Sequence, residues 1–430
     1  MRAPRRAAAS IKAALETLGR YYLEAYGEPQ APISPDEEPG GPKAQPDRLA
    51  GRTDLLIIGA GPFGLAMAAY ARHLGLDYLI VGQPMGFWKT NMPEGMHLRS
   101  ASDWPLDPLG LHTIDKFLEV TGRTRSDVEP LSREFYLRYA EWFRQEAQVD
   151  PIPVRVRRLD YTCDTLPFEA TTEEGRTIQA RRVVIAVGCQ YFKHCPRELV
   201  QRLPQRRYSH TCDLVDLCSL EGKRCLILGG RQSAFEWTAL LNETGAAAVH
   251  VSYRHDSPRF EPSDWSWVQP VVDGMIEDPG WFRRLPQRDK EAITYRLWAE
   301  GRLKLEPWLE SRVMKDSVTL WPRTRLARAD ATPHGAVRVT LDNGKTITVD
   351  HIILATGYRC DIDKVPFLSR GNIVNALAKY DGFPVLDEHF QTNIPGLFVT
   401  SMSAARDFGP FLRFTVSVRA SARIIGQKLV

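Results

Sequence analysis

The stretch Leu55-Leu56-Ile57-Ile58-Gly59-Ala60-Gly61-Pro62-Phe63-Gly64 decides the fold of this 430-residue chain. A continuous apolar run is typical of a buried parallel strand, and the glycines after it allow a tight turn into a helix. The helix predicted from Gly64 to Ala71 is rich in small residues, which suits close packing on a sheet. Such a strand–loop–helix unit typically binds the pyrophosphate of a dinucleotide, because loop N–H groups and the positive helix end face it.

A second glycine loop, Gly229-Gly230-Arg231-Gln232-Ser233-Ala234, follows the apolar run 225–228. Each loop is followed, at nearly the same distance, by an apolar strand that ends in glycine: 183–188 in the first case and 352–357 in the second. The repeated plan predicts two dinucleotide-binding units in one chain. A protein with two such units usually passes electrons from one dinucleotide to the other.

Both units depart from the standard pattern. An acid that binds a ribose hydroxyl is expected after the strand 78–81, but the chain has Gly82 there, so something else must hold this ribose. In the second loop Arg231 replaces the second glycine and could itself contact a phosphate. Arg254, after the strand 249–253, suits the 2′-phosphate of NADP, which an acid would repel. A solvated surface arginine is the alternative for Arg254.

Short alternating runs lie between each loop and its second strand. They predict an antiparallel meander in each unit, at 154–156, 168–170 and 177–179 in the first, and at 318–320, 337–340 and 346–349 in the second. Asn343-Gly344 is a strong hairpin signal. We therefore predict an α/β fold of two Rossmann-like domains with antiparallel β-meanders, the second domain inserted in the first at about 208–345.

The composition is that of an ordinary globular protein, with 43% hydrophobic and 25% charged residues. A net charge of +4 does not argue for nucleic acid as a partner. No run of 18 apolar residues occurs, so no membrane span is expected, and the start of the chain lacks the apolar core of a signal peptide. These features predict a cytoplasmic protein.

The seven cysteines form no C-x-x-C pair and match no common zinc spacing. This argues against a dithiol redox centre, a disulfide scaffold and a metal site. A helix predicted near the N-terminus, with Ile11, Leu15, Leu18 and Tyr22 on one face, could contact the main body or a second subunit. The segment 27–51, with many Pro, Gly and acidic positions, is predicted to be a linker.

The two loops, with Ala355-Thr356-Gly357-Tyr358 after the second unit, resemble those of NADPH-dependent single-component (class B) flavin monooxygenases, including the N-hydroxylating amine oxygenases. Gly86-Phe87-Trp88 and the stretch 95–100 lie where these enzymes place residues near the flavin. The stretch 408–414 is similar to the start of their helix that faces the flavin ring. The Phe and Gly that ketone-oxidising members carry six and four residues before a His are Pro204 and Arg206 here, before His210, so that branch is disfavoured. For His210 a structural hydrogen bond and a functional role both stay open.

The resemblance implies FAD in a first domain, 51–207 and 346–430, and NADPH in an inserted domain, 208–345, after an N-terminal helix and linker at 1–50. It further implies that reduced FAD reacts with O2 to give a C4a-hydroperoxyflavin, which transfers one oxygen atom to a small molecule, with nitrogen (N-hydroxylation) favoured over sulfur. No catalytic side chain is assigned, because such chemistry is centred on the flavin. The predicted cofactor-binding residues are Gly59, Gly61, Pro62, Phe63, Gly64, Phe87, Trp88, His97, Gly229, Gly230, Arg231, Gln232, Ser233, Arg254, Gly357, Tyr358, Gly409, Pro410 and Phe411.

Two alternatives stay open. One is a flavin-dependent NADPH oxidase or reductase without oxygen transfer. The other is a non-catalytic NADP(H)-binding protein of the same fold, which the off-pattern residues Gly82 and Arg231 would suit. The segment 256–310, with five tryptophans, is predicted to be a substrate lid, a dimer surface or part of the core.

Overall fold

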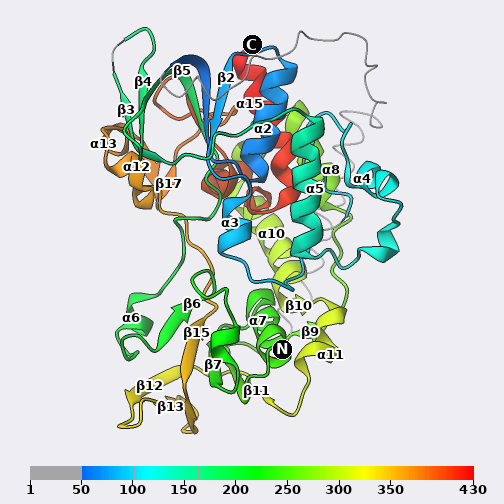
Figure 1. The fold of residues 1–430 in the computed structure, drawn as a ribbon, viewed down its shortest axis with the longest axis vertical. Helices are drawn as coiled ribbons and strands as arrows, with labels where there is room; N and C mark the ends of the chain where they lie inside the picture. Colours follow the sequence, from blue (N-terminus) through cyan, green and yellow to red (C-terminus); the bar gives the residue numbers. More distant parts are fainter. Residues whose placement is uncertain (1–50, 101, 163) are drawn as a thin grey trace.

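Two sheets, each with its own glycine loop, form the frame of the molecule, with the first unit above the second in Figure 1. The computed structural model describes residues 51–430 except 101 and 163. The predicted helix and linker at 1–50, and with them the two alternatives of a contact with the main body or with a second subunit in a homodimer, lie outside the described residues.

The first sheet has the order β2-β1-β5-β4-β3, and β18 also pairs with β5. Its parallel part places β1 between β2 and β5, and the four residues Leu55–Ile58 in β1 are buried. The antiparallel meander β3-β4-β5 confirms the appendage predicted for the first unit. The strands are β1 (Arg52–Ile58), β2 (Tyr78–Val81), β3 (Val156–Tyr161), β4 (Phe168–Thr172), β5 (Thr177–Ile185) and β18 (Leu397–Val399).

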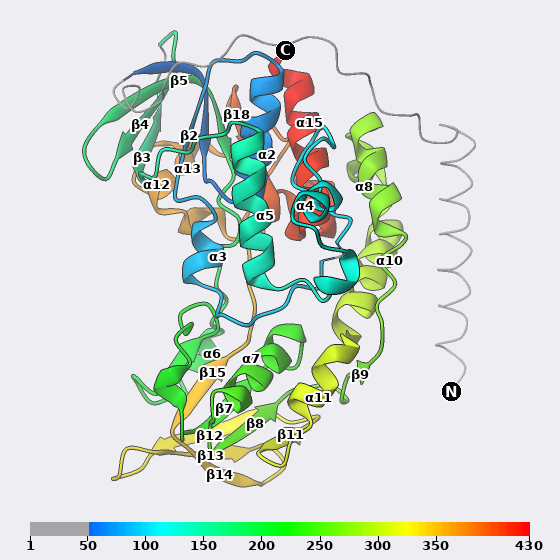
Figure 2. The ribbon, with the colours of Figure 1, turned by 45° about the vertical axis from the view of Figure 1, so that its right-hand side comes forward.

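Two long helices lie side by side against this sheet, α2 (Pro62–His73) and α15 (Val418–Leu429) (Figure 2). Gly426 makes their contact possible, since a Cβ there would come 2.3 Å from the ring of Tyr70. The other helices before the second unit are α3 (Gly86–Thr90), α4 (Ile114–Val120), η2 (Arg125–Asp127), α5 (Arg133–Glu146) and α6 (Arg197–Val200).

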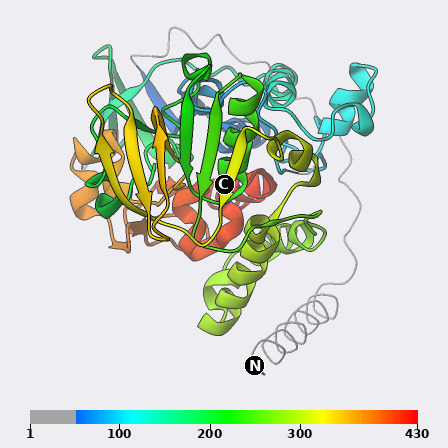
Figure 3. The ribbon, with the colours of Figure 1, turned by 90° about the horizontal axis from the view of Figure 1, so that it is seen from below.

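The second sheet is parallel throughout, in the order β11-β8-β7-β15-β6, and lies at the front of Figure 3. A separate antiparallel meander, β12-β13-β14, contains the predicted hairpin, with Gly344 at φ +81°. The elements are β6 (Tyr208–His210), η3 (Cys218–Leu220), β7 (Arg224–Leu228), α7 (Gln232–Glu243), β8 (Ala248–Ser252), β11 (Val318–Trp321), β12 (Leu326–Ala331), β13 (Val337–Leu341), β14 (Thr346–Val349) and β15 (His351–Leu354).

Two details of the second unit differ from the prediction. The run 318–320 belongs to the parallel sheet, as β11 beside β8, and the third meander strand is β12. The alternating polar residues of β12 did not indicate a strand. The second sheet also continues to Leu354, because β15 pairs with β7, so this unit extends beyond the boundary predicted at 345.

Part of the tryptophan-rich segment 256–310 packs against the first unit and not against the second sheet. Val268, Val272, Met275 and Ile276 of α8 join the hydrophobic core of the first unit. In Figure 2 the labels α8 and α10 follow one another down one side of the molecule, from the first unit towards the second. The elements here are β9 (Arg259–Phe260), α8 (Val268–Glu277), α9 (Trp281–Arg284), α10 (Gln287–Trp298), the π-helix η4 (Ala299–Leu303), β10 (Lys304–Leu305), η5 (Pro307–Leu309) and α11 (Glu310–Val313).

The stretch 408–414 does not open a helix, contrary to the prediction. Gly409 has φ +92° and Phe414 is extended, so the chain makes two separate 3-10 turns before α15 begins at Val418. The helix α15, and with it the positive end of its dipole, therefore starts four residues after Phe414. The remaining elements are η6 (Ile362–Lys364), α12 (Pro366–Ser369), α13 (Ile373–Ala376), β16 (Lys379–Tyr380), β17 (Phe383–Pro384), η7 (Ser401–Ala404), α14 (Ala405–Phe408), η8 (Pro410–Arg413) and η9 (Thr415–Ser417). Over the described ranges, each helix is too short or too polar to cross a bilayer.

Candidate dinucleotide and substrate site

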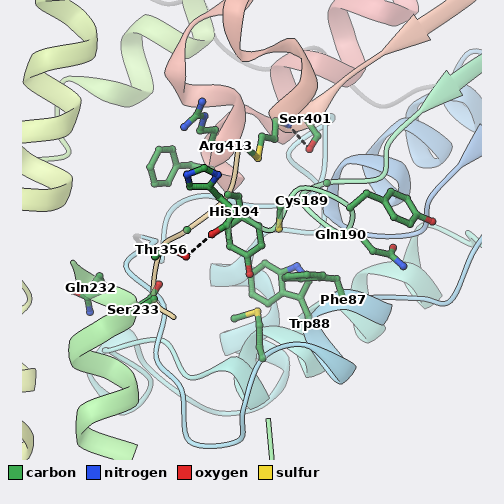
Figure 4. Close-up of a pocket in the computed structure, with 18 of the residues that line it drawn as sticks. Phe87, Trp88, Cys189, Gln190, His194, Gln232, Ser233, Thr356, Ser401 and Arg413 are labelled. Atoms are coloured by element: carbon green, nitrogen blue, oxygen red, sulfur yellow. Dashed lines mark hydrogen bonds between the residues drawn. The ribbon is translucent and has the colours of Figure 1, made fainter. Parts of the chain in front are cut away.

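A cavity of about 1000 Å³ is lined by both glycine loops. This volume lies at the upper end of the range for small-molecule sites, about 300–1,000 Å³. Figure 4 shows side chains entering from several sides: Phe87 and Trp88 from α3, Gln232 and Ser233 from the start of α7, and Arg413 from η8. The structure thus places the two nucleotide-binding loops against one shared space.

The three glycines of the first loop have different physical roles. A Cβ on Gly59, at φ +114°, would come 2.4 Å from the carbonyl oxygen of Ala186, and one on Gly64 would come 1.7 Å from that of Gly59. Gly61 has no protein atom within 4 Å of a Cβ and is the N-cap of α2, with no side-chain cap. The loop is therefore tightly packed at its ends and open at its centre, beside free helix N–H groups. This arrangement fits the pyrophosphate of FAD.

The end of β2 shows why glycine replaces the usual acid. Gly82 has φ +136°, and a Cβ there would come 3.0 Å from the amide nitrogen of Ala60. Gln83 and Arg155 line the cavity beside it, and the Gln83 Nε2 donates to the carbonyl oxygen of Pro153 at 2.9 Å. Both polar side chains line the cavity near the end of β2, and the glycine pattern did not indicate them.

Aromatic and strained residues form another part of the cavity. The rings of Phe87 and Tyr358 meet edge to face at 6.1 Å, and Trp88 stacks on the buried Tyr136 at 4.8 Å. Ser401, after β18, is buried at φ +66°, a conformation that costs free energy for a residue other than glycine and is often found at functional sites. No sequence signal pointed to Ser401, because its strain arises from the backbone path.

The second loop departs from the glycine pattern of the first in two ways, with Arg231 at the second glycine position and Ala234 at the third. Gly229 has φ +149°, and a Cβ there would come 2.4 Å from the carbonyl oxygen of Ala355. Arg231 is the N-cap of α7 in an extended conformation, as Gly61 is for α2, and its side chain is exposed to the cavity. The Gln232 Oε1 is buried and has no hydrogen-bond partner among the described residues. An unpaired buried oxygen beside a free helix N-terminus fits a ligand that brings its own polar groups, as NADPH does.

Three guanidinium groups from different elements converge near this loop. Partial desolvation of its guanidinium in the cavity lowers the pKa of Arg231, and the positive charges of Arg254 and Arg413 lower it further. No ion pair to Arg231, Arg254 or Arg413 exists within the described part of the chain. Because like charges repel, the arrangement fits a bound polyanion.

A buried carboxyl lies behind the loop. Glu236 in α7 is fully buried, and burial raises its pKa to about 8. Its Oε1 accepts from the Gln232 Nε2 at 3.4 Å, and its Oε2 lies 3.6 Å from a guanidinium nitrogen of Arg312. His97, which lines the cavity, lies 3.3 Å from Arg312 through its Nδ1 and packs on Trp308. His97 thus connects the first unit to the second.

His210 forms hydrogen bonds that connect two loops of the protein. It is buried, its Nδ1 accepts from the amide of Cys212 at 3.2 Å, and its Nε2 lies 3.1 Å from the carbonyl oxygen of Gly357. The Nε2 must then carry the proton and donate it to Gly357. Thr356 in the same loop donates to the carbonyl oxygen of His194. Both bonds fix the Ala-Thr-Gly-Tyr loop at the cavity.

The structure brings most of the predicted site residues together. Those that line the cavity are Gly59, Gly61, Pro62, Phe63, Phe87, Trp88, His97, Gly229, Gly230, Arg231, Gln232, Ser233, Arg254, Gly357 and Tyr358. Gly64, Gly409, Pro410 and Phe411 do not line it: Phe411 is fully buried against Trp267, and a Cβ on Gly409 would come 3.1 Å from the ring of Phe282. The cavity face of that segment is Leu412–Thr415 instead. The binding roles of all these residues stay predictions.

A family model described as pyridine nucleotide-disulphide oxidoreductase matches residues 56–279, slightly more than half of the chain. The chain belongs to this family. Membership and the two-sheet fold confirm the prediction of a flavin-dependent oxidoreductase that uses FAD and a pyridine nucleotide.

Two proteins similar in sequence to this chain have names that describe different activities. The FAD-dependent urate hydroxylase of Xanthomonas campestris pv. campestris is 28% identical over 49% of this chain and 47% of its own length. The ferredoxin–NADP reductase of Paraburkholderia phymatum is 25% identical over 50% of this chain and 54% of its own length. The chain thus spans about half the length of these relatives.

The fold extends further than the sequence similarity. The ornithine N-hydroxylase of Kutzneria sp. 744, solved with reduced FAD, NADP+ and L-ornithine, superposes with a TM-score of 0.70 at 15% identity, covering 88% of this chain and 99% of that one. The predicted resemblance to N-hydroxylating flavin monooxygenases is therefore confirmed at the level of the fold.

Proposed function

We propose that the protein is an FAD- and NADPH-dependent monooxygenase that transfers one oxygen atom from O2 to a small molecule, at nitrogen. The observation that carries the proposal is the single cavity lined by both glycine loops, with an aromatic wall between them. The shared fold with an ornithine N-hydroxylase supports it.

The chain's own residues would hold the two cofactors in fixed places. The open centre of the first loop at Gly61 would take the FAD pyrophosphate, and the N–H groups at the start of α2 would bind its charge. Gln232 and Ser233 at the start of α7, with Arg231, would take the NADPH pyrophosphate, and Arg254 the 2′-phosphate.

When bound, FAD supplies hydride acceptance from NADPH and the activation of O2. The protein supplies a shielded space for this chemistry. Phe87, Trp88, Tyr358 and Leu412 form apolar walls that limit the access of water to the cavity. Burial lowers the pKa of His210 and so favours the neutral ring that holds the Gly357 loop in place.

Cysteine chemistry is the main alternative, because the family includes disulfide reductases by its description. Cys189 lines the cavity, but burial raises the pKa of its thiol to about 12, so the reactive thiolate is scarce. The sequence also contains no C-x-x-C pair. These two observations favour oxygen transfer over thiol–disulfide exchange.

The test separates three reactions with one set of assays. With NADPH and FAD present, we expect NADPH oxidation that requires O2 and that does not release thiol from oxidised glutathione. With a substrate, NADPH consumption should match product, and without one it should yield peroxide. Thiol release that tracks NADPH use would establish a disulfide reductase, and failure to bind flavin would support a non-catalytic nucleotide-binding protein.

Arg254→Gln should weaken NADP+ binding about 10-fold or more and leave NAD+ binding nearly unchanged, because the 2′-phosphate is absent from NAD+. The measurement is the Kd of each nucleotide by titration calorimetry on the FAD-loaded protein. Arg259→Gln is the control, since Arg259 is exposed, forms an ion pair with Glu261 and does not line the cavity. Equal weakening of both nucleotides by Arg254→Gln would contradict the assignment.

A further inference from the structure

Trp265 and Phe414 form a wall of the cavity that the two glycine loops do not reach. Their rings lie 6.3 Å apart, and the buried Trp104 supports Trp265 edge to face at 6.1 Å. Trp265 comes from the tryptophan-rich segment, and Phe414 follows the η8 turn. Both rings are half-buried and line the cavity. They offer apolar area that neither nucleotide-binding loop supplies.

Arg99 holds this wall in position. Its Nε donates to Glu306 Oε1 at 2.9 Å, and its other nitrogens donate to Ser263 Oγ at 2.5 Å, to the carbonyl oxygen of Glu300 at 3.3 Å and to that of Gly301. The guanidinium carbon lies 5.5 Å from the centre of the Trp265 ring. The charge of Arg99 is therefore paired with Glu306, and four of its five N–H donors have partners in the protein, which makes it a positioning residue for the wall.

The backbone opposite Trp265 is also specialised. Residues Ala299–Leu303 form a π-helix, a rare element that is frequent at functional sites. Arg99 binds two carbonyl oxygens of this turn. A Cβ on Gly301 would come 3.0 Å from Cη2 of Trp265, so the missing side chain leaves room for the ring. Sequence positions far apart thus cooperate to place a single indole.

The charges around the wall disfavour a cationic ligand. Glu306 is paired with Arg99, and Glu300 with Lys304 at 2.8 Å. Among the described lining residues Glu198, in α6, is the one acid. Arg413, next to Phe414 in the chain, forms no ion pair with any described residue. An ammonium group at this wall would have no counter-ion, whereas an anionic group could bind Arg413.

We propose that the Trp265–Phe414 wall binds the substrate and selects a flat, nitrogen-containing aromatic or heteroaromatic molecule without positive charge. This inference rests on the proposed function for the location of the substrate. It separates this chain from its structural neighbour solved with L-ornithine, an aliphatic amino acid. A flat ring would stack on the indole, and an anionic substituent would face Arg413.

The test is equilibrium binding to the oxidised FAD- and NADP+-loaded protein. Titration calorimetry with urate and 4-aminobenzoate, as flat anionic probes, is compared with L-ornithine and cadaverine. We expect at least one flat probe to bind and both aliphatic cations to bind at least 10-fold more weakly. Trp265→Ala should weaken the flat probe about 10-fold or more, and Trp265→Phe about 3-fold or less. Trp321→Phe, at the edge of the second sheet, should change nothing.

Arg99→Gln tests the positioning role. It should weaken the flat probe and change the near-UV circular dichroism of the tryptophans, while the Kd of NADP+ stays within about 2-fold. Tighter binding of an aliphatic cation, no binding of either flat probe, or unchanged binding in both Trp265→Ala and Arg99→Gln would overturn the proposal. The binding assay needs neither O2 nor turnover, so it is independent of the activity test. If the protein binds the flat probe through Trp265 but turns over only to peroxide, the proposed function is contradicted and the proposed binding wall is supported.

Discussion

Gly61→Val should abolish FAD binding while leaving the apoprotein folded, and Gly64→Ala should destabilise the fold itself. The Cβ of residue 61 would enter open space at the start of α2, where the pyrophosphate is expected. The Cβ of residue 64 would come 1.7 Å from the carbonyl oxygen of Gly59, so the helix or the loop must move. Overpacking of this kind typically costs about 1–3 kcal/mol or more.

The measurement combines the bound flavin absorbance with the urea midpoint of the flavin-free protein. Gly61→Val should be colourless after reconstitution, with an apoprotein midpoint near that of the parent chain. Gly64→Ala should lower the apoprotein midpoint. Full flavin content in Gly61→Val would contradict the placement of FAD at this loop. An unchanged apoprotein midpoint in Gly64→Ala would contradict the packing role of Gly64.

Glu236→Gln should stabilise the protein above about pH 8 and have little effect near pH 4.5. Burial raises the pKa of Glu236 to about 8, against an ordinary value of 4.5. The unfolded chain therefore loses this proton first, and the folded state loses stability as the pH rises from about 4.5 to about 8. At 1.4 kcal/mol per pKa unit the full effect is of the order of 5 kcal/mol.

The free energy of unfolding of both proteins, measured from about pH 4.5 to pH 9, checks this expectation. The difference between them should grow with pH and level off above about pH 8. Glu243→Gln is the matched control, because Glu243 also binds Arg312 but is more exposed, with 45% of its side chain accessible. A difference that is constant with pH would show that Glu236 is ionised in the folded protein throughout.

The glycine loops could be predicted because their pattern is local. Gly59 and Gly229 both require positive φ, and the apolar strands before them are continuous, so the nucleotide units follow from short stretches of sequence. The long-range pairing of β15 with β7 and of β11 with β8 depends on tertiary contacts. The first pairing extends the second unit beyond the predicted boundary at 345, and the second places the run 318–320 in the parallel sheet and not in the meander.

The wall of the cavity could not be predicted for a related reason. Arg99 forms hydrogen bonds with Ser263, Gly301 and Glu306, which lie 164 to 207 positions further along the chain. The path of residues 408–414 is set by Gly409 and by its contact with Phe282, which no local pattern encodes. The abundance of tryptophan indicated that the segment 256–310 mattered, without showing which ring faces the cavity.

The proposed function depends on oxygen transfer, and isotopic labelling detects this transfer in the product. The FAD-loaded protein is supplied with NADPH and 18O2 and with urate, 4-aminobenzoate, L-ornithine or cadaverine, and the products are analysed by mass spectrometry. We expect a product that carries one 18O atom, formed in proportion to the NADPH consumed. NADPH consumption whose oxygen is recovered entirely as peroxide, with every probe unlabelled, would contradict it.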